Sequence, residues 1–193
     1  MLFFWELWAP ILVSSCTVFV LAMLLRLVLH QSEWRQLPQH AEVTQALRRV
    51  PPAPGLYMLP HTIGQDLGRA DLYAALEQGP VAYVTIARNG VPSASGRLLT
   101  SFLYYCGVST VVAYATWHGF STLNSGIRHM PLGIPFAHVV RVVFAIAGLA
   151  YAAAAFQDSV WFGRPWKSFL LTMVDAAVYA LSTAVIFAWL WPI

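Results

Sequence analysis

Charge is scarce in this chain. Only 10% of its 193 residues are Asp, Glu, Lys or Arg, whereas 59% are hydrophobic. Charged residues make up about 25% of a typical soluble domain. A water-soluble fold of this length has too little polar material to cover so much apolar surface. The composition excludes an ordinary soluble protein, and basic residues this sparse exclude nucleic acid as a partner.

Cysteine and catalytic motifs are also nearly absent. Cys16 and Cys106 are the two cysteines, which excludes a disulfide scaffold and a CxxC metal site. We interpret both as small apolar residues inside membrane spans. The sequence contains no GxSxG, Walker, GxGxxG or HExxH motif. We therefore expect no enzyme activity, no bound metal and no cofactor.

Long hydrophobic runs are what the sequence has instead. An apolar stretch of about 20 residues crosses the roughly 30 Å hydrocarbon core of a bilayer as a helix. Four such runs occur, and they predict spans at about 9–30, 97–118, 136–157 and 167–191. The predicted fold class is an all-α transmembrane protein. Its four-helix membrane bundle is built from residues 1–30 (span 1) and residues 97–193 (spans 2–4).

Residues 31–96, between the first two spans, have a different character. They contain seven of the twelve prolines. Helical periodicity predicts a short helix at 69–77, and residues 41–49 are predicted as a helix that ends before Pro51 and Pro52. Residues 55–59 and 81–86 are predicted as strands. This pattern indicates a small α+β cap. The cap is too small for a large core of its own, so we expect it to pack against the helix ends and against partner proteins.

The distribution of Lys and Arg predicts the orientation. With four spans, nine of the eleven Lys and Arg residues fall on the side that holds residues 31–96, and only Arg128 and Arg141 fall on the other side. Cytoplasmic loops carry such an excess of Lys and Arg. We therefore expect residues 31–96 to be cytoplasmic and both termini to lie outside.

The short turn between spans 3 and 4 is rich in residues that prefer the membrane interface. Tryptophan rings sit at headgroup level, and cations attract anionic lipids. Asp158 can also pair with a cation across the turn. The predicted anchors are Trp161, Arg164, Trp166 and Lys167.

Asp175 is the candidate for chemistry within the membrane. It lies eight residues into span 4, or roughly 12 Å deep, where a carboxylate costs about 2.5–3.5 kcal/mol to insert. Thr172, Asp175, Tyr179 and Ser182 form one polar stripe on this helix. Tyr105 lies at similar depth on span 2, and Arg26 on span 1 could reach Asp175. This group is either a proton relay or ligand site, or a structural lock that fixes helix register.

Two further features have alternative interpretations. Small residues at helical spacing on span 3 allow close approach of another helix, either inside the bundle or from another subunit. They are Ala145, Gly148, Ala152 and Ala155. His118 and His138 lie at one membrane level and could ligate haem, but we interpret them as hydrogen-bonded helix-end residues.

Several strings in the chain resemble a family of small, uncharacterised bacterial inner-membrane proteins. These strings are WAPILVSS, GPVAYVTI, VYALSTAVIFAWLWP, the PAPGLYMLPH stretch at 52–61 and, most distinctive, WFGRPW at 161–166. The resemblance covers nearly the whole chain. It implies four spans and a bacterial source with a multi-pass location in the inner membrane. It implies no activity, so it assigns no functional residue.

Two functions fit these observations. The first is a non-catalytic accessory subunit of a larger bacterial energy-converting membrane complex, respiratory or photosynthetic, with lipid and other membrane subunits as partners. The alternative is a small proton-coupled, transporter-like protein centred on Asp175. A subunit predicts a packed bundle, whereas a transporter predicts a polar cavity at mid-depth. The sequence does not identify a small-molecule substrate.

Overall fold

The computed structural model describes residues 2–31, 33, 35–62, 70–123 and 133–192. In chain order the elements are α1 (Leu2–Leu29), α2 (His40–Arg49), β1 (Gly55–Leu59), α3 (Ala70–Gln78), β2 (Ala82–Ile86), α4 (Ala94–Leu123), α5 (Phe136–Trp161) and α6 (Trp166–Trp189).

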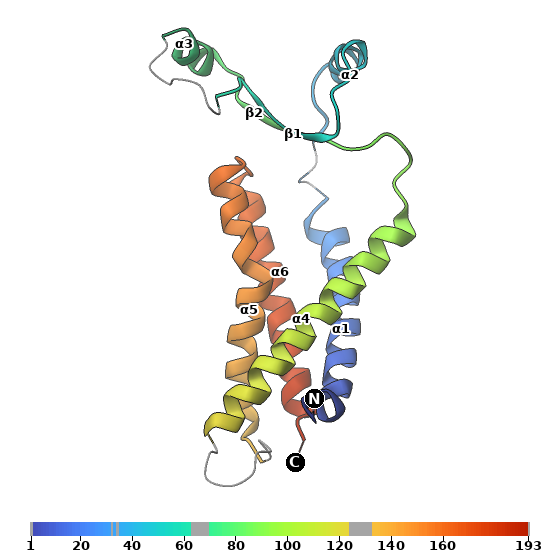
Figure 1. The fold of residues 1–193 in the computed structure, drawn as a ribbon, viewed down its shortest axis with the longest axis vertical. Helices are drawn as coiled ribbons and strands as arrows, with labels where there is room; N and C mark the ends of the chain where they lie inside the picture. Colours follow the sequence, from blue (N-terminus) through green and yellow to red (C-terminus); the bar gives the residue numbers. More distant parts are fainter. Residues whose placement is uncertain (1, 32, 34, 63–69, 124–132, 193) are drawn as a thin grey trace.

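Four of these helices, α1, α4, α5 and α6, are long and apolar enough to cross a membrane. This fits a multi-pass membrane protein. Figure 1 shows them side by side, with α4 running obliquely across the others and both termini at the end away from the small elements. α1 begins before the predicted span because it continues outward through Trp5 and Trp8, whose side chains are exposed.

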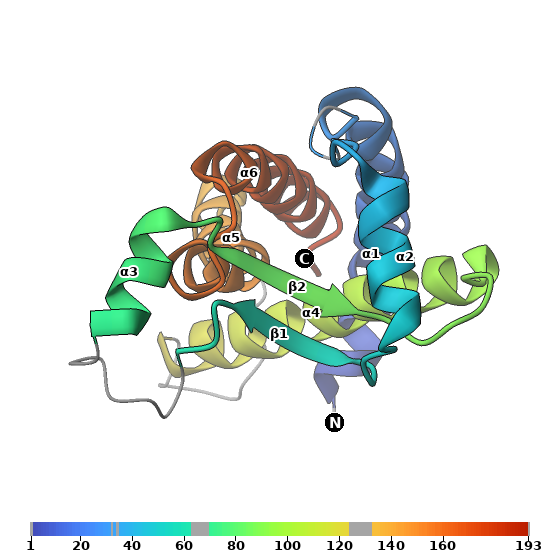
Figure 2. The same cartoon turned by 90° about the horizontal axis from the view of Figure 1, so that it is seen from above.

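The elements between α1 and α4 form the predicted α+β insert, which we call the cap (α2, β1, α3 and β2). β1 and β2 pair antiparallel, with Gly55 opposite Ile86 and Leu59 opposite Ala82. Both strands and both helices were predicted within one residue at the bounds that the structure describes; Arg69, the predicted start of the second helix, lies outside the described residues. Figure 2 shows the two strands crossing over the end of the bundle.

The cap touches the bundle at the turn between α5 and α6. Gly163 in this turn has a φ of +61°, and a Cβ placed there would lie 2.8 Å from the ring of Tyr83 on β2. Glycine therefore suits this turn for two reasons. It adopts the left-handed backbone conformation without strain, and it leaves room for the ring of Tyr83.

α5 and α6 form a close hairpin. Gly148 faces α6, since a Cβ added to it would meet the Cβ of Ala180 at 3.7 Å, and Ala155 is buried. Ala152 is half-buried and Ala145 is exposed. The small-residue row on α5 is thus divided, and Gly148 is used for packing inside the bundle. Small side chains there let the two backbones approach closely.

The apolar core lies at the end of the bundle away from the cap. It combines the first turns of α1 and α5 with the last turns of α4 and α6, and includes Leu7, Ile11, Val112, Trp117, Phe120, Val139, Val143, Phe187 and Trp191. Nearer the middle, the hydroxyl groups of Ser14 on α1 and Ser109 on α4 are 3.1 Å apart and buried. The far end of the bundle is therefore closely packed, mainly with apolar side chains.

Candidate functional site

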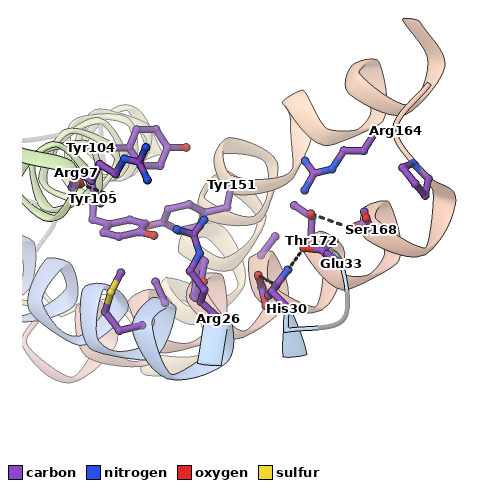
Figure 3. A pocket seen from close by; sticks show the side chains of 17 residues that line it. Arg26, His30, Glu33, Arg97, Tyr104, Tyr105, Tyr151, Arg164, Ser168 and Thr172 are labelled. Atoms are coloured by element: carbon purple, nitrogen blue, oxygen red, sulfur yellow. Dashed lines mark hydrogen bonds and ion pairs between the residues drawn. The ribbon is translucent and has the colours of Figure 1, made fainter. Parts of the chain in front are cut away.

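A cavity of about 760 Å³ lies among the cap-facing halves of the four membrane helices. This is within the roughly 300–1,000 Å³ of typical small-molecule sites. Figure 3 shows its lining. The residues that line it include Arg26, His30, Glu33, Arg97, Ser101, Tyr104, Tyr105, Tyr151, Arg164, Ser168, Thr172, Asp175 and Tyr179.

Helical spacing explains why these side chains meet. Arg26 and His30 are four residues apart at the end of α1, so they share one face. On α6 the residues Ser168, Thr172, Asp175 and Tyr179 repeat every three or four positions and face the cavity together. Two helices thus present polar stripes to each other, although each is apolar over most of its surface.

A carboxylate–imidazole–carboxylate chain forms one wall of the cavity. The Nε2 atom of His30 is 2.7 Å from Oδ2 of Asp175, and its Nδ1 atom contacts Oε2 of Glu33. All three side chains are only 13% exposed. His30 therefore links the turn after α1 to the interior of α6.

The surroundings of His30 and Glu33 favour their charged forms. Burial opposes protonation of His30, but its contacts with Glu33 and Asp175 outweigh burial and raise the pKa of the imidazole. Burial likewise opposes ionisation of Glu33, and the side chains of Ser168 and His30 outweigh it and lower the pKa of that carboxyl. A cationic imidazole donates from both ring nitrogens, which matches the two carboxylate partners.

Three tyrosines from three helices lie against one another deeper in the cavity. The ring centroids of Tyr105 (α4), Tyr151 (α5) and Tyr179 (α6) are 5.6–6.3 Å apart. The Tyr151 hydroxyl is buried and has no hydrogen-bond partner among the described residues. This part of the cavity is therefore lined by aromatic rings that carry hydroxyl groups.

Three arginines also line the cavity. Arg26 comes from α1, Arg97 from α4 and Arg164 from the turn before α6 (Figure 3). Arg164 is 3.7 Å from Asp158. Within the described part of the chain, neither Arg26 nor Arg97 forms an ion pair with a carboxylate.

Four of the five residues predicted as an intramembrane lock or relay meet in this cavity: Asp175, Arg26, Tyr179 and Tyr105. Ser182 does not line it, and its hydroxyl donates instead to the Val178 carbonyl at 2.7 Å. Arg26 was placed where it could reach Asp175, but among the described residues the ion-pair partner of this carboxylate is His30, which contacts Oδ2. His30 lies one helical turn beyond Arg26, nearer the cap, and contacts Asp175 there.

Sequence reasoning missed His30, Glu33, Arg97 and Tyr151. His30 was detectable, since it repeats the face of Arg26 after four residues. Glu33 lies in the turn beyond α1, where periodicity gives no direction. Tyr151 stood in a row of small residues that was interpreted only as a packing surface.

The predicted anchors occupy the cap end of the α5–α6 hairpin. Trp161 and Trp166 are 68% and 57% exposed, and Lys167 is also exposed. Arg164 differs, because it lines the cavity. The two histidines that could ligate haem contact aromatic rings in the structure. The ring of His118 packs on Tyr114, and the ring of His138 packs on Phe120.

Comparisons with protein-family models, curated proteins and solved structures found no match. The resemblance based on WFGRPW stays a prediction. Among the residues that the structure describes, no group of three or more His, Cys, Asp or Glu side chains is arranged to hold a metal ion. The function is therefore argued from the cavity itself.

Proposed function

We propose that this protein is a small proton-coupled, transporter-like membrane protein in which Glu33, His30 and Asp175 pass protons between one membrane surface and the cavity. The contact of His30 with both carboxylates carries the proposal. Proton pathways in membrane proteins are typically chains of Asp, Glu and His, and α6 alone supplies only one such residue. The turn after α1 supplies the other two.

The chemistry of imidazole suits this role. Histidine changes charge near physiological pH, and its two nitrogens can take up a proton on one side and release it on the other. Asp175 lies nine residues into α6, or about 14 Å from the start of the helix. We therefore propose that Glu33, His30 and Asp175 together extend from the end of α1 toward the middle of the hydrocarbon layer.

The polar cavity is the second support. A bundle with a purely structural role is expected to be packed along its length, whereas a transporter requires space for a ligand. The cavity of about 760 Å³ lies next to Asp175. Protonation of Glu33, His30 and Asp175 and binding of a ligand in the cavity would therefore influence each other.

Proton flux into proteoliposomes tests the proposal. The full chain is reconstituted around a trapped pH-sensitive dye, a pH gradient is imposed, and valinomycin with potassium removes the membrane potential. We expect faster equilibration than in protein-free liposomes, and a return to the protein-free rate in His30→Gln and Asp175→Asn. His40→Gln is the matched control, since His40 lies on the cap outside the cavity. Unchanged flux in Asp175→Asn would contradict the relay.

We also propose an orientation. In this proposal the cap and the cavity face the cytoplasm of a bacterial cell, the four helices cross the inner membrane and both termini lie in the periplasm; the excess of Lys and Arg on the cap side supports it. An epitope inserted after Thr62 should be reachable by antibody only after the inner membrane is permeabilised. Recognition in intact spheroplasts would reverse the orientation.

A second candidate is the accessory subunit of a bacterial energy-converting membrane complex. Exposed apolar side chains on and beside the cap favour it: Val50 is 79% exposed, Leu56 71% and Val91 97%. The cap elements lie outside the candidate membrane spans, so a partner protein is one way to cover these residues. Gentle detergent extraction followed by a native gel and mass spectrometry tests this. Migration as a lone 21.4 kDa protein would count against it.

A further inference from the structure

Among the described residues, none of the three arginines of the cavity forms an ion pair with Glu33 or Asp175, although the charge of Arg164 helps to lower the pKa of Glu33. They come from separate elements, and they line the same space as His30. His30 already contacts both carboxylates that line the cavity, Asp175 and Glu33. The cavity thus carries more positive than negative charge. The excess comes from arginine side chains, which can bind an anion through two parallel hydrogen bonds.

The arginines differ in how far they are neutralised. Arg164 has Asp158 at 3.7 Å. Arg26 and Arg97 have no carboxylate partner among the described residues. A cation that lines a cavity without a counter-ion is well placed to bind an anionic ligand. Arg26 and Arg97 are exposed, so a ligand can reach them without disrupting the core.

Phosphate is the anion that fits this arrangement. Guanidinium groups bind phosphate oxygens through two parallel hydrogen bonds, and a phosphate group has enough oxygens to accept from several arginines at once. The arginines lie at the cap ends of α1, α4 and α6, where lipid headgroups meet the ends of membrane helices. The tyrosines below them provide aromatic surface for the rest of a ligand.

We infer that this cavity binds a phosphate group through Arg26, Arg97 and Arg164, borne either by a membrane phospholipid or by a soluble phosphate ester. The inference names the substrate class of the proton-coupled site and so rests on the proposed function. It differs from general attraction of basic residues to anionic lipid, because it assigns the binding to arginines that line the cavity.

The test measures binding to the purified full chain in dodecyl maltoside. Dioleoyl phosphatidic acid is compared with dioleoylglycerol, which has the same chains without the phosphate, and glycerol 3-phosphate is compared with glycerol. Bound lipid is counted by native mass spectrometry, and soluble ligands are followed by tryptophan fluorescence. We expect at least one phosphate-bearing ligand to bind at least about tenfold more tightly than its counterpart, since hydrogen bonds between charged groups are the strong ones.

Variants separate the cavity from the surface. Arg26→Gln/Arg97→Gln should weaken phosphate binding at least about tenfold, whereas Arg48→Gln/Arg49→Gln should leave it nearly unchanged. Arg48 and Arg49 are the matched control because they are exposed on the cap helix α2 and do not line the cavity. Arg26→Lys/Arg97→Lys keeps the charge and should restore part of the affinity, which guards against loss through misfolding.

Each outcome has a defined meaning. Binding of phosphatidic acid alone identifies a lipid headgroup, and binding of glycerol 3-phosphate identifies a soluble ester; both support the inference. Equal binding with and without the phosphate, or equal weakening by Arg48→Gln/Arg49→Gln and by Arg26→Gln/Arg97→Gln, overturns it. Proton flux that depends on His30 without phosphate binding would refute this inference and leave the proton chain standing, and the reverse result would refute the proton chain.

Discussion

The contact between His30 and Asp175 joins two helices that are 145 residues apart in the chain, and its energy can be isolated. His30→Ala leaves the buried Oδ2 of Asp175 without its partner, and Oδ1 of that carboxyl has no partner among the described residues in any case. Breaking a fully buried pair costs about 3–5 kcal/mol. We expect about 2–3 kcal/mol here, because each side chain keeps 13% exposure.

A double-mutant cycle measures the coupling. Asp175→Asn removes the charge that His30 contacts, so His30→Ala should cost less in that background, by about 1.5–2 kcal/mol. Unfolding free energies come from titration with SDS in mixed micelles, followed by circular dichroism. The same cycle with His40→Ala should be additive, since His40 bonds to Gln36 on the surface. A His30–Asp175 coupling within about 0.5 kcal/mol of zero would refute the pair.

Three further predictions concern pH and packing. The folded state raises the pKa of His30 above its usual 6.5, so the stabilisation by its charge is complete below pH 6.5 and is lost as pH rises through the raised value. The free energies of unfolding of wild type and His30→Gln should therefore differ at low pH and become equal at alkaline pH. Gly163→Ala should cost about 1–3 kcal/mol, since its φ is +61° and the Tyr83 ring lies in the way; adding Tyr83→Ala should recover part of the loss, and equal stability of Gly163→Ala and wild type would contradict the contact. Ser109→Ala should cost only about 0.6 kcal/mol if its hydroxyl bonds to Ser14, and nothing further when Ser14→Ala is already present.

Much of the fold could be predicted from the sequence, for a physical reason. A backbone that crosses lipid must satisfy its own hydrogen bonds, so each long apolar run becomes a helix. The β-branched and aromatic residues of AYVTI identified β2. The bounds of α1 were less predictable, because interfacial tryptophans such as Trp5 and Trp8 are compatible with either a helix or its flank.

The site was predictable in part. Asp175 and Tyr179 stood out because polar residues are costly within the membrane, and their spacing gave the face of α6 that meets the cavity. The partner of Asp175 was not predictable, since periodicity gives the face and depth of a residue but not which helix stands opposite. His30 therefore escaped attention, although it lies on the same face as Arg26. Glu33 depends on the path of a turn, which no helical pattern determines.

Access to the cavity from the cap side is the most direct test of the account. In a Cys16→Ala/Cys106→Ala background, Thr172→Cys places a thiol in the cavity lining, whereas Ser182→Cys lies on the same helix outside the lining. A membrane-impermeant thiol reagent should label residue 172 from the cap side of sealed vesicles and should leave residue 182 unlabelled. Labelling of residue 172 from the opposite side, or equal resistance of both thiols from the cap side, would contradict a polar cavity that opens toward the cap.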